Sequence, residues 1–310
     1  MGKYVVTNGQ NIYDVALHVY GSIEGIVDLL MNNTDLSLSD DLQTGDELIY
    51  TDDFIINADV VAYNSLHGIV PSNGERLVYP KYFTLPLTVT FRLLPTLTSA
   101  GFTASGSGKI EIDWGDNSPV ETITLSRSAF TYTHIFDNEI ADTRVIRWYS
   151  DASFVLADWS NLQASSIRLL RPFRVEEFVL RDRAIPIDFF CLTEGMYEAD
   201  LHGLTASDLS PLISCRDLMR LNLTDAKLKS SVVDDYLLQL VAVYGLRRNC
   251  EVILSVRPGG EYREPERDEN GRYRVRSGME AIWVIVHEPA WNEGGAWRFV
   301  IENELYTAEQ

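Results

Sequence analysis

The chain has 310 residues, of which 45% are hydrophobic and 23% are charged, a balance typical of folded globular proteins and unlike that of disordered chains. Its 45 acidic and 26 basic residues give a net charge of −19, which argues against binding to duplex nucleic acid or to anionic membranes. The acidity is concentrated in residues 1–80, which hold twelve acidic and two basic residues. At roughly 100–200 residues per domain, the length predicts two or three domains.

The three cysteines, Cys191, Cys215 and Cys250, are scattered in apolar stretches with no paired spacing. We therefore expect buried free thiols in a reducing compartment, and neither a disulfide framework nor a zinc site. The first ten residues hold one lysine and no apolar run typical of a signal peptide, and no stretch approaches the roughly 20 apolar residues of a membrane span. These features predict a chain that is made and kept in a cytoplasm, or released by lysis.

Residues 3–50 predict a small unit with the order strand, helix, helix, strand. Residues 3–7 form a β-branched and aromatic run typical of a strand, and residues 48–50 form a second one. Two stretches between them carry apolar residues at the spacing of an amphipathic helix. The expected buried stripes are Ile12, Val15, Ala16 and Val19 in the first helix and Ile23, Ile26, Val27 and Leu30 in the second.

This pattern resembles a LysM domain over about a sixth of the chain. The resemblance is carried by Tyr4-Val5-Val6, Gly9-Gln10-Asn11-Ile12-Tyr13-Asp14-Val15-Ala16, Val19-Tyr20-Gly21, Asn32 and Leu42-x-x-Gly45-Asp46-x-Leu48. It implies one of two roles: binding of N-acetylglucosamine polymers, or assembly, as in phage tails and contractile injection systems. Assembly is the expected role, because wall-binding members follow a signal peptide. The implied contact loops are Thr7, Asn8, Gly9, Gln10 and Asn11, and Asn32, Asn33, Thr34 and Asp35.

Residues 51–80 predict a connecting segment with a short helix from Asn57 to Leu66. The order of the LysM-like unit and this segment resembles that of proteins encoded in Bacteroidetes phages and prophages. A domain boundary is expected at Tyr79-Pro80-Lys81.

Residues 81–150 predict a β-sandwich. The run from Ile110 to Ser118, which contains Asp113-Trp114-Gly115-Asp116, resembles the strand and turn of PKD-type immunoglobulin-like domains, and Thr133-His134-Ile135-Phe136 resembles their later strand. Trp114 is expected in the sandwich core. Asp113, Asp116 and His134 have two interpretations, a metal or acid–base cluster and a set of turn and core contacts. The second is favoured, since two carboxylates are too few to specify a cation site.

Residues 151–310 contain a repeat with spacings of 21 and 22 residues. Its three copies are Val175-x-x-Phe178-x-Leu180, Met196-x-x-Ala199-x-Leu201 and Leu218-x-x-Leu221-x-Leu223. They resemble short, divergent leucine-rich repeats, although Arg183, Leu204 and Ala226 stand where that family usually has Asn. Two further helices, from Ser231 to Gly245 and from Ser277 to before Pro289, are expected to close the stack together with late strands.

No enzyme is expected, because the sequence has no recognisable catalytic or nucleotide-binding fingerprint and its histidines are dispersed. For the same reason we expect no metal and no cofactor. A basic cluster either forms surface salt bridges with nearby acids or docks on the acidic amino-terminal region of another copy. Its members are Arg168, Arg171, Arg174, Arg181 and Arg183.

The expected fold class is multidomain α+β, with a LysM-like βααβ domain, a connecting segment, a PKD/Ig-like β-sandwich and a leucine-rich-repeat-like region. The corresponding ranges are 1–50, 51–80, 81–150 and 151–310. The expected function is that of a structural virion protein of a phage tail or baseplate, which contacts other tail proteins and copies of itself and is located in the virion tail after synthesis in the bacterial cytoplasm. The alternative is a peptidoglycan-binding module of a cell-wall-associated protein.

Overall fold

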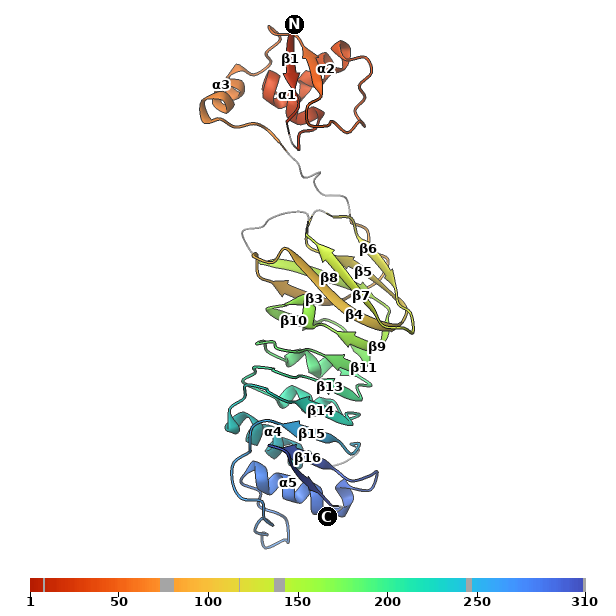
Figure 1. Ribbon diagram of the computed structural model, residues 1–310, viewed down its shortest axis with the longest axis vertical. Coiled ribbons are helices and arrows are strands. Elements are labelled where there is room, and N and C mark those ends of the chain that lie inside the picture. Colours follow the sequence, from red (N-terminus) through yellow and green to blue (C-terminus); the bar gives the residue numbers. More distant parts are fainter. Residues whose placement is uncertain (8, 73–80, 117, 137–142, 244–246, 309–310) are drawn as a thin grey trace. The chain divides into compact units, whose positions relative to one another are not determined.

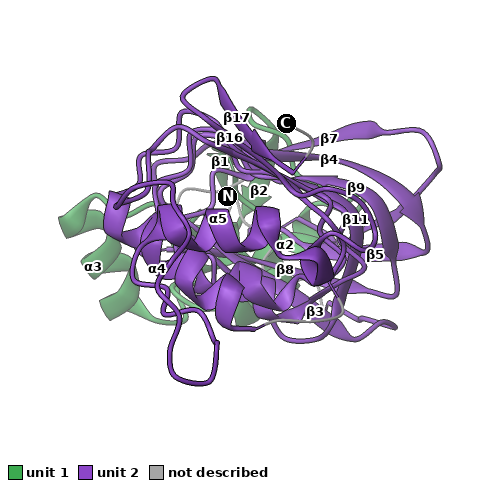
Figure 2. Cartoon of the chain, turned by 90° about the horizontal axis from the view of Figure 1, so that it is seen from below, with its two compact units in different colours: residues 1–80 green, residues 81–310 purple. Residues whose placement is uncertain are grey.

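The structure is a computed structural model that describes residues 1–310 except 8, 73–80, 117, 137–142, 244–246 and 309–310 (Figure 1). It has a mixed α+β fold, as expected, and it divides into two compact units, residues 1–80 and 81–310 (Figure 2). The expected boundary residues Tyr79 and Pro80 lie outside the described residues. In the described part, no helix has the length and apolar character needed to cross a membrane.

The first unit follows the predicted order of strand, helix, helix and strand. Its elements are β1 (Gly2–Val5), α1 (Ile12–Tyr20), the 3-10 turn η1 (Ile23–Gly25), α2 (Ile26–Asn32), β2 (Glu47–Tyr50) and α3 (Ala58–His67). Strands β1 and β2 pair antiparallel. The Asn11 side chain caps α1 by accepting hydrogen bonds from two backbone N–H groups, and the Asp14 carboxylate accepts a hydrogen bond from the Asn11 N–H, which completes a capping box.

The helix α1 ends at Gly21, whose φ of 71° places it in the left-handed region. A Cβ atom at this position would lie 2.1 Å from the carbonyl oxygen of Asn57, so only glycine fits here. The close approach lets the N–H groups of Ile56 and Asn57 donate to the Tyr20 carbonyl oxygen. These two bonds fix the start of α3 beside the end of α1.

Of the four apolar residues predicted to form the buried face of the second helix, two face the core and two do not. Ile26 is buried and Leu30 partly buried, but Ile23 and Val27 are 54% and 62% exposed, and Leu29 takes the inward position instead. The cause is η1, because a 3-10 turn has three residues per turn and changes the rotation of every later residue relative to an α-helix that begins at Ile23. The stripe of α1 is correct, with Val19 partly buried.

The second unit contains two sheets. The five-stranded antiparallel sheet has the order β10-β3-β8-β5-β6, and the larger sheet has the order β17-β16-β15-β14-β13-β11-β9-β4-β7, with β12 on β11. The strands of the first part are β3 (Leu87–Leu93), β4 (Ser99–Ser107), β5 (Lys109–Asp113), β6 (Glu121–Thr124), β7 (Phe130–Ile135), β8 (Arg144–Ser150), β9 (Ser153–Asp158) and β10 (Ser166–Leu169). Trp114 is 1% exposed, which confirms its expected place in the core.

The later strands run parallel from β9 to β16. They are β11 (Phe173–Val179), β12 (Thr193–Glu194), β13 (Glu198–Asp200), β14 (Arg220–Leu223), β15 (Glu251–Leu254) and β16 (Arg298–Ile301), and β17 (Glu304–Thr307) pairs antiparallel at the end. The repeat positions Phe178, Ala199 and Leu221 are register partners in neighbouring strands, and all three are fully buried. Val252 and Phe299 continue the same apolar row.

The connections and covering elements are mostly short. They are η2 (Ser160–Leu162), η3 (Asp188–Leu192), η4 (Ser210–Ser214), α4 (Ser230–Ala242), α5 (Gly278–His287) and η5 (Pro289–Trp291). The helices α4 and α5 pack against each other beside the last strands (Figure 1). Cys215 and Cys250 are buried, but Cys191 is exposed, contrary to expectation, because η3 turns Phe189 and Phe190 into the core instead.

Residues 81–150 and 151–310 are not separate bodies, contrary to the expected boundary at residue 150. Strand β9 pairs antiparallel with β4 on one side and parallel with β11 on the other, so that one sheet crosses the expected boundary. A single hydrophobic core extends through both regions. The sequence shows strands on both sides of residue 150, but it does not show that one strand joins the two sets.

Candidate functional site

The first expected contact loop uses two of its polar side chains internally. Gln10 is 4% exposed: its Oε1 accepts from the Tyr4 hydroxyl at 2.9 Å and from the Thr7 N–H at 2.8 Å, and its Nε2 donates to the Pro71 carbonyl oxygen at 2.8 Å. Asn11 is the cap of α1. Thr7 and Gly9 are exposed, and Asn8 lies outside the described residues. The outward polar surface of this loop is therefore smaller than the sequence suggests.

The second expected loop behaves in a similar way. The Asn33 side chain donates to the carbonyl oxygens of Leu29 and Ile49, both at 2.8 Å, and accepts from the Ile49 N–H at 2.9 Å. It thereby ties the end of α2 to β2. Asn32 donates to the Thr51 hydroxyl at 3.3 Å. Thr34 and Asp35 remain exposed.

An exposed apolar stripe follows η1 and α2. Ile23, Val27 and Met31 are spaced four residues apart, which places them on one side of a helix, and they are 54%, 62% and 75% exposed. A soluble helix normally turns such a stripe toward a core. The spacing of these residues is visible in the sequence, but the sequence does not show that they face outward, because that direction depends on the rotation introduced by η1. We call Ile23, Val27 and Met31 the α2 stripe.

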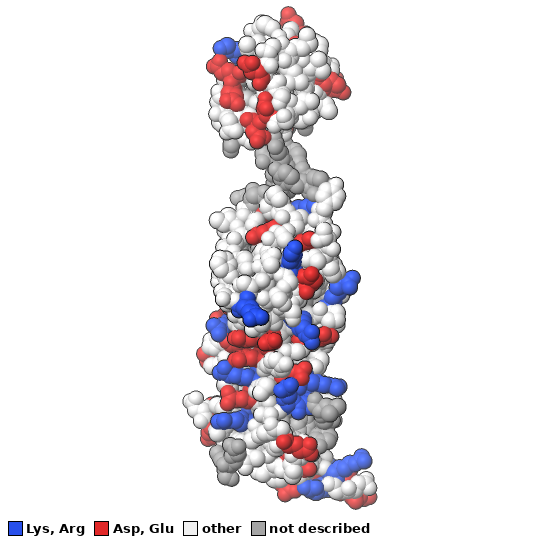
Figure 3. Space-filling model, turned by 90° about the vertical axis from the view of Figure 1, so that its right-hand side faces the viewer, with Lys and Arg blue, Asp and Glu red and all other residues white. Residues whose placement is uncertain are grey.

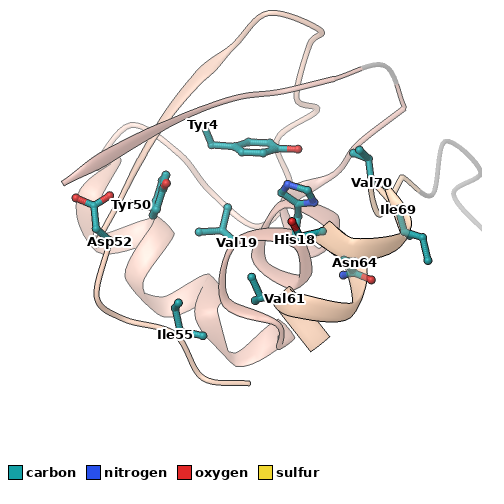
Figure 4. A pocket seen from close by; sticks show the side chains of 12 residues that line it. Tyr4, His18, Val19, Tyr50, Asp52, Ile55, Val61, Asn64, Ile69 and Val70 are labelled. Atoms are coloured by element: carbon teal, nitrogen blue, oxygen red, sulfur yellow. The ribbon is translucent and has the colours of Figure 1, made fainter. Parts of the chain in front are cut away.

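A cavity of about 420 Å³ lies within the first unit, between the strands, α1 and α3 (Figure 4). Tyr4, His18 and Val19 line it from β1 and α1, and Val61 and Asn64 line it from α3. The Tyr4 and His18 ring centroids are 5.2 Å apart. Burial lowers the pKa of His18, which favours the neutral imidazole. No sequence pattern predicts this cavity, since its lining residues come from segments that are far apart in the chain.

The five arginines of the expected basic cluster do not form one patch. Arg168 lies on β10 in the five-stranded sheet, whereas Arg174 lies on β11 in the larger sheet, and Arg171 is in the exposed turn between them. Arg181 lies beyond the far end of β11, roughly 20 Å along the strand from Arg174, and its Nε donates to Asp200 at 2.8 Å. Arg183 donates to the Arg181 carbonyl oxygen. Among the described residues, Arg181 is the member of the cluster that forms a salt bridge, and its partner is Asp200 on the next strand and not one of the expected neighbours Glu176, Glu177 and Asp182.

A row of alternating charges crosses the outward face of the parallel strands, and Figure 3 shows acidic and basic side chains interspersed on one face of the second unit. Arg220 contacts Glu198 at 2.8 Å and Glu251 at 3.7 Å, and Arg298 contacts Glu251 at 3.7 Å. At the other end of the row, Glu177 has a raised pKa, because of its partial burial and the neighbouring carboxylates of Glu198 and Asp200. The charges from Glu198 to Arg298 thus pair within the sheet, whereas the end of the row at Glu177 carries neighbouring like charges.

Asp113, Asp116 and His134 make turn and core contacts. The Asp113 carboxylate accepts from Lys81 at 2.6 Å and from Arg147 at 3.3 Å. The Asp116 carboxylate contacts His134 Nε2 at 2.7 Å and accepts from both the N–H and the hydroxyl of Ser118. Burial opposes ionisation of Asp116, but the bonds from His134 and Ser118 outweigh it and hold its pKa well below the usual range. Across the described residues, no group of three or more His, Cys, Asp or Glu side chains could hold a metal ion.

Comparison of the chain with protein families, with curated proteins and with solved structures finds no match.

Proposed function

We propose that this chain is a structural protein of a bacteriophage tail or tail-like particle, of the baseplate type, which acts by assembly with other proteins and performs no catalysis. The α2 stripe is the observation that carries the proposal. It places three apolar side chains on the surface of a small unit whose order of elements is similar to that of LysM domains, and exposed apolar groups of this kind mark protein interaction sites.

The contact loops also favour assembly over glycan recognition. Sugar recognition needs polar side chains that point outward and are free to exchange hydrogen bonds with hydroxyl groups. Gln10, Asn11 and Asn33 instead satisfy groups of the chain itself. We propose that the PKD-like and leucine-rich-repeat-like parts of the second unit support this role by presenting a rigid lateral surface.

The direct test is to purify particles induced from a host that carries this gene and to search them for the chain by quantitative mass spectrometry and cryo-electron microscopy. We expect the chain at a fixed copy number, with the α2 stripe buried against a neighbour. Particles that lack the chain would refute the proposal.

The second candidate function is binding to peptidoglycan, favoured by Tyr13, which is 45% exposed two residues after the first loop and could stack on a sugar ring. Sedimentation of the chain with purified peptidoglycan tests it, with Tyr13→Ala as the variant that should lose binding. Binding to wall fragments, together with absence from particles, would select this function.

A further inference from the structure

The cavity of the first unit contains polar groups that the chain leaves without partners. Asn64 is 8% exposed and is the one buried residue of α3, and its side-chain amide makes no hydrogen bond with any described residue. The Nδ1 atom of His18 is also buried and has no partner within the described part of the chain. Leaving a buried polar atom such as this Nδ1 unsatisfied is costly, and native structures rarely do so unless water or a ligand completes its hydrogen bonding.

The Asn64 amide and the His18 ring are part of a cavity wall that is otherwise mainly apolar. In Figure 4, Asn64 and His18 lie near Ile69 and Val70, whereas Tyr50 lies farther along the cavity. A volume of about 420 Å³ lies within the usual range of binding pockets, and an apolar lining with a few convergent polar groups is their usual composition. A carboxamide donates and accepts at the same time, which matches the N–H and C=O of a peptide unit.

The surroundings of the cavity are acidic. Residues 1–72 contain eleven Asp and Glu residues and one lysine, Lys3, which is paired with Glu47 at 2.7 Å. Asp52 lines the cavity with a half-exposed carboxylate, one oxygen of which pairs with the Met1 ammonium at 2.7 Å, and Asp53 follows it in the chain. Such a field favours an occupant with positive charge beside its apolar part and disfavours an anionic one.

We propose that this cavity is a docking site for an extended segment of a partner protein, in which an apolar side chain such as Leu enters the cavity next to Lys or Arg residues. The apolar side chain packs between Tyr4, Val19 and Val61, and the adjoining peptide unit bonds to Asn64. The flanking basic side chains remain outside, near Asp52. The inference rests on the proposed assembly function, because it names the chemistry of a partner, and it adds a site separate from the α2 stripe.

The test uses the full chain with isotope-labelled histidine, in which the ring signals of His18 are assigned by their loss in His18→Gln. Three capped probe peptides are titrated at neutral pH: acetyl-Lys-Leu-Lys-amide, acetyl-Lys-Ser-Lys-amide and acetyl-Glu-Leu-Glu-amide. We expect the first to shift the His18 signals with saturation, and the other two to bind at least about tenfold more weakly, since each lacks either the buried side chain or the favourable charge.

Two variants locate the binding. Val61→Trp fills the cavity and should abolish the shift, whereas Leu66→Trp adds the same group on the 81% exposed side of α3 and should leave it unchanged. Should Val61→Trp fail to fold, Asn64→Leu, which keeps the size but removes the carboxamide, should weaken binding about tenfold. Equal binding of all three peptides, no binding of any, or binding that survives both cavity variants would overturn the proposal.

The outcome is separable from that of the proposed function. If the chain is found in particles and no probe binds, the cavity proposal alone fails. If the probe binds as expected but particles lack the chain, the assembly function fails, and the cavity stands as a peptide site of another system. A free apolar molecule as the true occupant would appear as binding of acetyl-leucine-amide as tight as that of the basic peptide, which also overturns the proposal.

Discussion

The proposed assembly function predicts that replacement of the α2 stripe by polar residues removes the chain from purified particles without unfolding it. The triple change Ile23→Gln, Val27→Gln and Met31→Gln introduces glutamine, a good helix former, at each position and so leaves the helix intact. Full burial of an Ile, Val or Met side chain contributes about 1.5–3 kcal/mol. Because these side chains are still 54%, 62% and 75% exposed, burial in an interface would add about 1–2 kcal/mol each. The three together amount to about 4 kcal/mol, or roughly a thousandfold in Kd.

The assay is the amount of chain per particle, measured by quantitative mass spectrometry after expression of each variant in a host that lacks the wild-type gene. The matched control is Tyr63→Gln with Leu66→Gln, which removes exposed apolar groups from α3 in the same unit. We expect near-complete loss for the triple variant and retention for the control, with thermal unfolding unchanged within a few degrees for both. Normal incorporation of the triple variant, or equal loss for both sets, would refute the assignment of the stripe as an interface.

Three further predictions concern the second unit, each measured by chemical denaturation. Asp116→Ala leaves the donors of His134 and Ser118 unsatisfied and should lower the free energy of unfolding by about 3 kcal/mol at pH 7. Since the pKa of Asp116 is lowered in the folded state, the difference in unfolding free energy from wild type should narrow as the pH falls below 3.8. A difference that stays constant with pH would contradict this origin. Leu221→Ala opens a cavity in the buried row and should cost about 2–5 kcal/mol, and a cost below 1 kcal/mol would show that the row is not tightly packed. Glu177→Gln should stabilise the fold at neutral pH, because the pKa of this carboxyl is raised by burial and by neighbouring carboxylates. The gain in stability should disappear at a pH below 4.5, the ordinary pKa of a glutamate side chain. Destabilisation at pH 7 would disprove the repulsion.

The local parts of the fold were predictable because their causes are local. Asn11 and Asp14 form a capping box that the sequence alone can signal, and the spacing from Ile12 to Val19 defines the buried face of α1. The row through Phe178, Ala199 and Leu221 was predictable for a similar reason, since equal spacing places equivalent residues in register when strands stack in parallel.

The remaining features depend on contacts between distant residues. The single 3-10 turn η1 rotates α2 relative to the predicted helix, so that Val27 faces outward while Ile26 stays buried, and nothing in the three residues of η1 distinguishes it from the first turn of an α-helix. The pairing of β9 with β4 joins Asp158 to Thr103 across more than fifty residues. The cavity is of the same kind, since His18, Tyr50 and Asn64 meet only because the chain returns α3 to the end of α1.

The two units use their charged and apolar residues in opposite ways, and this bears on where partner specificity resides. In the second unit, the outward row of the parallel sheet pairs its charges internally, as at Arg220 between Glu198 and Glu251, so that little of its field is left for a partner. The first unit carries eleven acidic residues and one lysine in residues 1–72, so that it keeps a net negative charge, and its α2 stripe is exposed. Apolar contact supplies affinity, and the net negative charge of residues 1–72 favours a positively charged partner. A basic partner with an apolar surface should therefore bind residues 1–72 in preference to the second unit. Exchange of the acidic residues beside the α2 stripe, such as Glu24, for lysine should therefore change which partner binds while it leaves the second unit folded and unchanged.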